Sequence, residues 1–283
     1  MTATTQTTSA LADAHLSTGG ILRSEWVKLV TLRSTWWCLG IIAALTVGIP
    51  ALVALALASL SVGGGSGDGA FFTWMTATTV PIGFSVLAAA VLGCLVITGE
   101  YGTGMIRSTM TAAPKRLSAL FAKALVIGAV VLVVSFVALA LGAFASGAIL
   151  GTADITVDAS EPRVWLTLLA AAGYPALVAV FSVGVGTMLR NSAGAIAAVL
   201  GLLLVVPTIF QLVGGLLQAT WAFDVGAFLP SSLGSTMYTP VAEGMSFTQG
   251  TITLEPWQAT LALAAWAVAA LAGGAALIKS RDV

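Results

Sequence analysis

The segment Thr98–Lys123, TGEYGTGMIRSTMTAAPKRLSALFAK, separates two long apolar runs of the chain. It holds one carboxylate, Glu100, and four of the eleven basic residues, namely Arg107, Lys115, Arg116 and Lys123. Because most other long segments are nearly uncharged, this concentration of charge predicts a segment that faces water and contacts another surface.

The order of residues within this segment predicts a helix, a break, a short helix and a further helix. Glycines at positions 99, 102 and 104 loosen the end of a helix, and Pro114 suits the first turn of a new one. Residues 105–112 can form about two helical turns. Ile106 and Met110 share a face of that helix because they stand four residues apart, and the face could dock in a groove. The alternative is an ordinary basic loop between two membrane spans.

The composition indicates an integral membrane protein. Hydrophobic residues make up 58% of the chain and charged residues 8%, with a mean hydropathy of +1.04, whereas soluble domains carry about 25% charged residues. Six apolar stretches reach the ~20 residues that cross a ~30 Å hydrocarbon core. They cover residues 37–60, 74–98 (with Pro81 inside), 120–150, 164–189, 193–217 and 257–278.

The N-terminal residues predict a tail followed by an interfacial helix. Residues 1–20 are rich in Thr, Ala and Ser, so we expect a disordered tail, with residues 21–283 forming one transmembrane domain. At about 100° per residue, Ile21–Ser34 separates an apolar half from a polar half. Trp26 suits the lipid headgroup level, and Lys28 and Arg33, on the same helix as Glu25, suit an anionic inner leaflet. Membrane lipid is therefore an expected partner.

Charge sorting predicts the orientation. With this layout, ten of the eleven Lys and Arg residues lie on one side of the membrane, and Arg163 alone lies on the other. Positively charged residues are retained in the cytoplasm, so both termini are expected there. Glu100 then lies at the cytoplasmic end of the second span, where a partly desolvated carboxylate should pair with Arg107, Arg116 or the N-terminal helix. Alternatively, Glu100 only helps to fix the end of a helix.

Several kinds of machinery are missing from the sequence. There is no Gly-x-x-x-x-Gly-Lys-Ser/Thr motif, so we expect no P-loop nucleotide site in this chain. No ionisable residue occupies the middle of a predicted span, which argues against an ion-coupled carrier, an intramembrane catalytic site or a metal site. A predominantly apolar interior suits a hydrophobic or amphipathic cargo.

Two groups of residues resemble the ABC type 2 exporter permeases of high-GC Gram-positive bacteria. The N-terminal group comprises Arg23-Ser24-Glu25-Trp26, Lys28-Leu29 and Thr31-Leu32-Arg33-Ser34-Thr35-Trp36-Trp37. The central group comprises Glu100-Tyr101, Thr103-Gly104, Ile106-Arg107-Ser108-Thr109, Pro114-Lys115-Arg116 and Lys123. The spacing of the spans extends the resemblance over nearly the whole chain.

The resemblance implies a coupling helix that contacts a separate cytoplasmic ATPase subunit. ATP and Mg²⁺ would bind that partner, leaving this chain without a cofactor or catalytic residues. It also implies a second permease copy or paralogue, a bacterial plasma membrane location and no nucleic-acid partner. The residues expected at the coupling contact are Glu100, Tyr101, Gly102, Thr103, Gly104, Ile106, Arg107, Met110, Pro114 and Arg116.

Residues 218–256, between the last two spans, are too aromatic for a plain linker. The resemblance implies short helices there that cap the exit side, so Phe228, Pro230 and Tyr238 are candidates for an outer gate. The alternative is a loop that lies on the membrane without gating.

The sequence thus predicts an all-α membrane protein. It has six transmembrane helices, an N-terminal interfacial amphipathic helix, a cytoplasmic coupling helix between spans two and three, and short outer helices between spans five and six. The expected function is that of the transmembrane permease subunit of an ABC-type exporter. The alternative is a membrane-embedded binding or regulatory protein that moves nothing.

Overall fold

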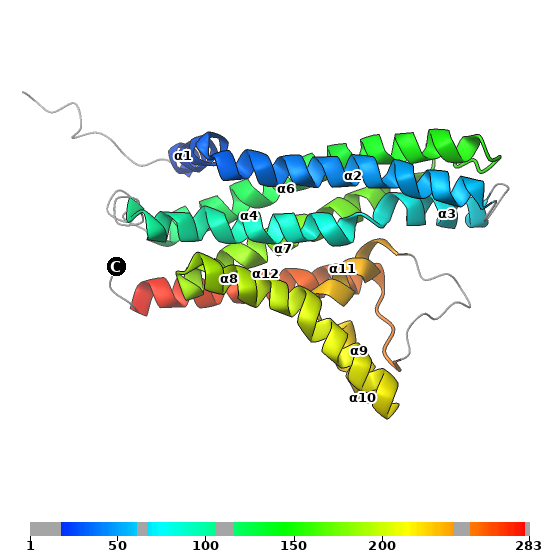
Figure 1. Ribbon diagram of the computed structural model, residues 1–283. Coiled ribbons are helices and arrows are strands. Elements are labelled where there is room, and N and C mark those ends of the chain that lie inside the picture. Colours follow the sequence, from blue (N-terminus) through cyan, green and yellow to red (C-terminus); the bar gives the residue numbers. More distant parts are fainter. Residues whose placement is uncertain (1–17, 61–66, 106–115, 240–249, 281–283) are drawn as a thin grey trace, which may run out of the picture.

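The computed structural model describes residues 18–60, 67–105, 116–239 and 250–280, and these residues form helices without a strand (Figure 1). Within these described residues, six helical stretches are long and apolar enough to cross a membrane, as predicted. The helices are α1 (Thr18–Thr31), α2 (Arg33–Ser59), α3 (Asp68–Thr79), α4 (Ile82–Gly102), α6 (Arg116–Gly151), α7 (Pro162–Leu189), α8 (Ser192–Leu200), the π-helical turn η1 (Gly201–Val205), α9 (Val206–Leu217), α10 (Thr220–Ala227), α11 (Pro230–Tyr238) and α12 (Pro256–Ser280).

The helix ends differ from the predicted ones in two informative places. The N-terminal helix begins at Thr18, so residues 18–20 are helical and do not belong to the expected tail. The second span is divided, since α3 ends at Thr79 and α4 begins at Ile82. Pro81 lies at the break, where its missing N–H prevents the α-helical hydrogen bond that would continue α3.

Helix α7 is the central element of the bundle and packs against α4, α6 and α12. Glycines at these contacts allow the helix axes to approach each other closely. A Cβ atom on Gly93 of α4 would overlap the carbonyl oxygen of Ala179, and one on Gly184 of α7 would lie 2.5 Å from the carbonyl carbon of Ala270. In the most apolar 18-residue stretch of the α7 span, 67% of the residues are buried within the protein. In the corresponding stretch of the span Ser192–Leu217, 17% are buried.

Helices α2 and α6 meet at a proline. Pro50 lies inside α2 and has no N–H, so the carbonyl of Thr46, four residues earlier, lacks its helical donor. Gly142 of α6 packs against this position, because a Cβ atom there would overlap the Thr46 oxygen and lie 3.0 Å from Cγ of Pro50. A backbone irregularity in one helix is therefore covered by a glycine of the next.

The fifth span changes helix type halfway. In η1 the N–H of Val206 donates to the carbonyl of Gly201, five residues earlier, before α9 continues. Helix α9 then leaves the bundle, and α10 folds back along it (Figure 1). Apolar side chains of α9 such as Leu212, Leu216 and Leu217 are exposed. Two short helices between spans five and six are present as predicted, namely α10 and α11.

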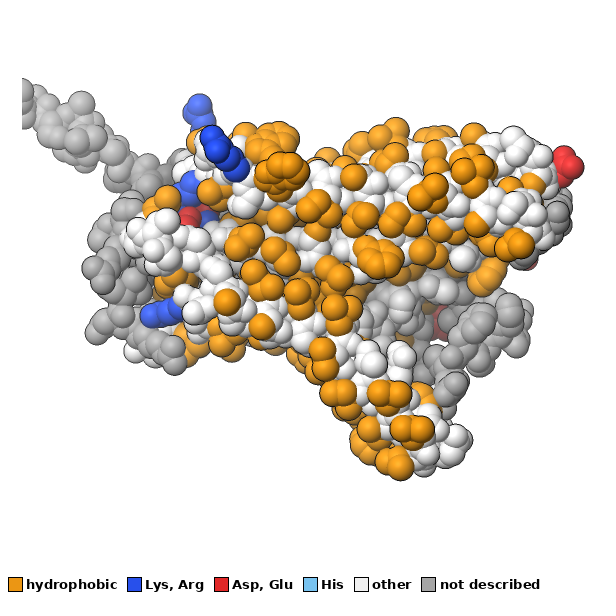
Figure 2. All heavy atoms as spheres, viewed as in Figure 1, with side chains coloured by type: hydrophobic (Ala, Val, Ile, Leu, Met, Phe, Trp, Pro, Cys, Tyr) orange, Lys and Arg blue, Asp and Glu red, His pale blue; other side chains and the backbone are white. Residues whose placement is uncertain are grey.

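Charged side chains are unevenly distributed over the bundle. Lys and Arg gather at the end that holds α1 and the C-terminal end of α12, as the space-filling view shows (Figure 2). Hydrophobic side chains cover most of the surface between the two ends in that view. This is the surface expected of a bundle surrounded by lipid hydrocarbon.

Candidate functional site

Four charged side chains from three helices meet at the end of the bundle where α1 lies. Nζ of Lys123 in α6 lies 2.5 Å from Oε2 of Glu25 in α1 and 2.8 Å from Oε1 of Glu100 in α4. Nζ of Lys28 in α1 lies 2.7 Å from Oε1 of Glu25 and 3.1 Å from Oε1 of Glu100. We call Glu25, Lys28, Glu100 and Lys123 the ionic cluster. It contains two positive and two negative charges.

Most of the ionic cluster is inaccessible to water. Glu25, Lys123 and Glu100 are 3%, 4% and 6% exposed, while the side chain of Lys28 is 27% exposed. The apolar side chains of Leu29, Leu32, Val96 and Val126 complete the walls of the site. Charges in such surroundings are tolerated only when each is paired, because desolvation of a single ion costs several kcal/mol.

Local sequence explains how the cluster is assembled. Lys28 and Leu29 follow Glu25 by three and four residues, so both lie on the same side of α1 as Glu25, the side that packs against the bundle. Glu100 lies in the last turn of α4, and Lys123 lies about two turns into α6. The cluster therefore joins the two helix ends that flank residues 106–115 to the N-terminal helix.

The electrostatics of the cluster keep Lys28 charged. Burial lowers the pKa of Lys28, but the hydrogen bond to Glu25 and the negative charges of Glu100 and Glu25 together outweigh burial, so the pKa is raised above its ordinary value. Glu100 receives both lysines on Oε1, while its buried Oε2 accepts no hydrogen bond from the part of the chain that the structure describes.

A second polar group lies at the same end, where α4 meets the turn between α7 and α8. Arg190 adopts a left-handed conformation (φ 56°) that ends α7, and its guanidinium lies 5.3 Å from the ring centroid of Tyr101. Asn191 then caps α8 by accepting a hydrogen bond from the N–H of Gly194. The hydroxyl of Ser192 donates to that of Thr98 at 2.9 Å, which ties α8 to α4.

The predicted coupling residues fall into two groups. Glu100, Tyr101 and Gly102 form the end of α4, and Thr103 and Gly104 form the turn after it, with Gly104 at φ 72°. Ile106, Arg107, Met110 and Pro114 lie outside the described residues, as does the side chain of Arg116 at the start of α6. A residue of the N-terminal helix was one of the partners expected for Glu100, and Lys28 of that helix does pair with it.

Sequence reasoning missed two members of the cluster. The sequence pattern places Glu25 on an interfacial helix, but its side chain is buried against the protein together with that of Leu29, whereas Trp26 and Arg33 are exposed. From the sequence, Lys123 is only one of several basic residues of its segment, and no partner is indicated for it. A usable signal existed, since Lys123 falls inside the predicted span 120–150, and an ionisable group at such a position needs a counter-charge.

The three candidate gate residues lie at the end of α10 and in α11, away from the end of the bundle that holds α1 (Figure 1). Phe228 follows α10 and is exposed, and its carbonyl accepts a hydrogen bond from the indole of Trp266 in α12 at 3.0 Å. Pro230 begins α11 and is buried, and Tyr238 ends it. Helix α11 packs closely on α7, because a Cβ atom on Gly234 would overlap the Tyr174 ring.

Comparison with known proteins gives a family for this architecture. The family model described as "ABC-2 family transporter protein" matches residues 21–207 of the 283. No curated protein matches the chain. The matched range includes all four residues of the ionic cluster and five of the six candidate spans, the fifth of them in part. The chain therefore belongs to the ABC-2 family of transporter proteins.

Proposed function

We propose that this chain is the permease subunit of an ATP-driven exporter, which moves a hydrophobic or amphipathic substrate across the plasma membrane. Members of the ABC-2 family are membrane components of ABC transporters, which in general act with an ATPase partner and in a dimeric arrangement. In this proposal ATP and Mg²⁺ bind the cytoplasmic ATPase subunit, and a second permease copy or paralogue completes the assembly.

The ionic cluster is the observation that carries the proposed coupling. Residues 106–115 connect α4 to α6, and the cluster fixes both of these helices to α1 within two turns of that connection. A push on the connection would therefore move α1, α4 and α6 together. In the proposed mechanism, ATP binding and hydrolysis move residues 102–113, the cluster transmits the displacement, and α10 and α11 open on the far side.

The proposal places both termini and the ionic cluster on the cytoplasmic side. Single cysteines in a background without Cys38 and Cys94 test this. A cysteine at the exposed position Ser160, between α6 and α7, should react with an impermeant thiol reagent in intact cells. A cysteine at the exposed position Ser280 should react only after lysis. Labelling of the Ser280 position in intact cells would contradict the orientation.

Glu100→Gln tests the coupling directly. The variant keeps the size of the side chain but removes the charge that Lys28 and Lys123 share. We expect membrane insertion, permease assembly and ATPase binding to persist, while transport per ATP hydrolysed falls several-fold. The measurement is ATP hydrolysis and transport in proteoliposomes that contain the permease and its ATPase subunit.

Glu255→Gln is the matched control, since Glu255 is exposed and lies beside the start of α12. This control should transport like the parent protein. Unchanged coupling in Glu100→Gln would remove the cluster from the mechanism. A parent complex that hydrolyses ATP without transport of any hydrophobic cargo would favour the regulatory alternative.

A further inference from the structure

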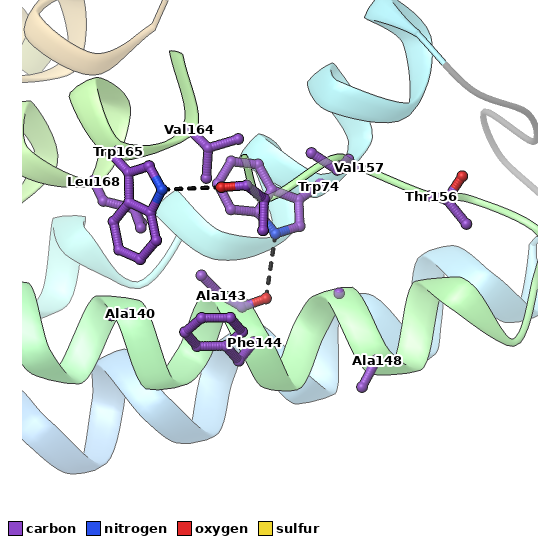
Figure 3. Close-up of a pocket in the computed structure, with 12 residues that line it drawn as sticks. Trp74, Ala140, Ala143, Phe144, Ala148, Thr156, Val157, Val164, Trp165 and Leu168 are labelled. Carbon is purple, nitrogen blue, oxygen red and sulfur yellow. Dashed lines mark hydrogen bonds between the residues drawn. The ribbon is translucent and has the colours of Figure 1, made fainter. Parts of the chain in front are cut away.

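A cavity of about 230 Å³, drawn in Figure 3, lies beside α3, at the end of the bundle opposite α1 (Figure 1). It is formed between α3, α6 and α7, and the connection from α6 to α7 closes part of it. Twelve residues line it, among them Trp74, Phe144, Gly147 and Trp165, with Thr156 as the residue that carries a hydroxyl. All but one of these side chains are apolar or glycine.

Both indole N–H groups of the lining are already used within the protein. The indole N–H of Trp74 donates to the carbonyl of Ala143 at 3.2 Å, and that of Trp165 donates to the carbonyl of Ala159 at 2.9 Å. Figure 3 shows both bonds beside the cavity. The indoles therefore offer hydrophobic surface and no free donor. A cavity of this kind favours hydrocarbon over water, which needs two to four polar partners.

The cavity opens toward the surface between α6 and α7. Phe144 and Trp165 are both exposed, and their rings approach each other at the rim with centroids 6.4 Å apart. Both helices belong to candidate membrane spans, and Trp165 lies in the first turn of α7. This position, near the end of a span and marked by an amphipathic indole, corresponds to the boundary between hydrocarbon and headgroups.

The surroundings of the opening are acidic. Asp154, Asp158 and Glu161 lie on the connection from α6 to α7, and Asp68 begins α3. Arg163, in the first turn of α7, is the one basic residue of the α6–α7 connection and the adjoining first turns of α3 and α7. It forms salt bridges with both Asp68 and Glu161. Its guanidinium also lies 4.3 Å from the centroid of the Phe71 ring. Asp158 accepts hydrogen bonds from the hydroxyl and N–H of Ser160, which lower its pKa and keep it ionised.

We propose that this cavity binds the hydrocarbon chain of an amphiphile with a cationic headgroup, and that the carboxylates of the α6–α7 connection hold the headgroup at the opening. The apolar lining recognises the chain, and the excess of carboxylates selects against anionic headgroups. Binding requires neither the ATPase subunit nor transport, so the proposal stands apart from the proposed function.

Two matched photoreactive probes test the site in the full-length chain. The chain is placed in phosphatidylcholine nanodiscs. One probe is an alkyl-trimethylammonium ion with a diazirine near the end of its chain, and the other carries a sulfonate on the same chain. The cationic probe should label residues of the cavity lining, such as Phe144 and Trp165, in a saturable manner. The sulfonate probe should label them several-fold less.

Two variants separate the chain site from the headgroup site. Gly147→Leu should place a side chain in the cavity, since a Cβ atom there meets only Trp74 at 3.9 Å, and labelling should be lost. Leu141→Phe is the control, because Leu141 is exposed on α6 but does not line the cavity. Asp154→Asn combined with Asp158→Asn should retain labelling but reduce the preference for the cationic probe.

Each alternative result overturns the proposal. Equal, unsaturable labelling by both probes would mean simple partition into the bilayer. Labelling that survives in Gly147→Leu, or that maps to other helices, would place the amphiphile elsewhere. An unchanged headgroup preference in the double Asn variant would remove the carboxylates from recognition. Monodisperse behaviour in nanodiscs, required of every variant, excludes misfolding as the reason for lost labelling.

Discussion

Lys123→Met should lower the free energy of unfolding by about 3–5 kcal/mol, the usual loss when one partner of a buried ion pair is removed. Lys123 is 4% exposed and contacts both Glu25 and Glu100. Without it, Lys28 is the one cation that the described residues place beside the two buried carboxylates. Methionine preserves most of the side-chain volume, so the loss reports charge and not a cavity. The measurement is reversible unfolding in mixed micelles, compared with the parent protein.

A charge-balanced double variant provides the decisive control. Lys123→Met combined with Glu25→Gln leaves one carboxylate, Glu100, facing one ammonium, Lys28. The double variant should therefore be more stable than Lys123→Met alone, which is a strongly non-additive result. Lys279→Met, at an exposed position near the end of α12, should change stability by less than about 0.5 kcal/mol. Additive losses in the double variant would show that the four charges do not act as a unit.

Gly93→Ala should destabilise the protein by about 1–3 kcal/mol, although alanine is normally the better helix former. The new methyl group would overlap the Ala179 carbonyl and lie 2.8 Å from Cβ of Ser182, so α4 and α7 would have to separate. This contact involves the two candidate spans whose most apolar stretches are the most buried of the six, so there is little room to shift. Unfolding in mixed micelles again provides the measurement.

Gly83→Ala is the matched substitution in the same helix. Gly83 is exposed, and nothing lies within 4 Å of the position of its added Cβ atom. The chemical change is identical, but its effect should be neutral or slightly stabilising because alanine favours the helix. If Gly93→Ala and Gly83→Ala had equal effects, close packing of α4 on α7 would not contribute to stability.

The sequence was sufficient for the fold because the signal for a membrane span is strong and local. Each of the six spans can be recognised from about twenty residues without knowledge of its neighbours. The division at Pro81 was less predictable. Proline removes a helical hydrogen bond, but its presence does not decide between a helix that continues, as α2 does through Pro50, and the end of one helix and start of another, as at Pro81.

The ionic cluster was less accessible because it depends on contacts far apart in the chain. Periodicity assigned an apolar side to the N-terminal helix, but it could not distinguish lipid from protein as the environment of that side. Leu29 faces the bundle and Trp26 does not, although both belong to the same apolar half. Close contacts of glycines, such as that of Gly93 with Ala179, could not be predicted for the same reason. No local sequence pattern indicates which residue lies opposite the glycine.

The π-helical turn in the fifth span has a consequence for the direction of its side chains. A π-turn contains one more residue than an α-turn, so everything that follows is rotated by about 100° relative to an uninterrupted α-helix. Residues of α8 and α9 that share a stripe on a uniform helical wheel therefore point in different directions. One continuous span thus presents two independent faces, with α8 directed at α4 and α7 and α9 packing against α10.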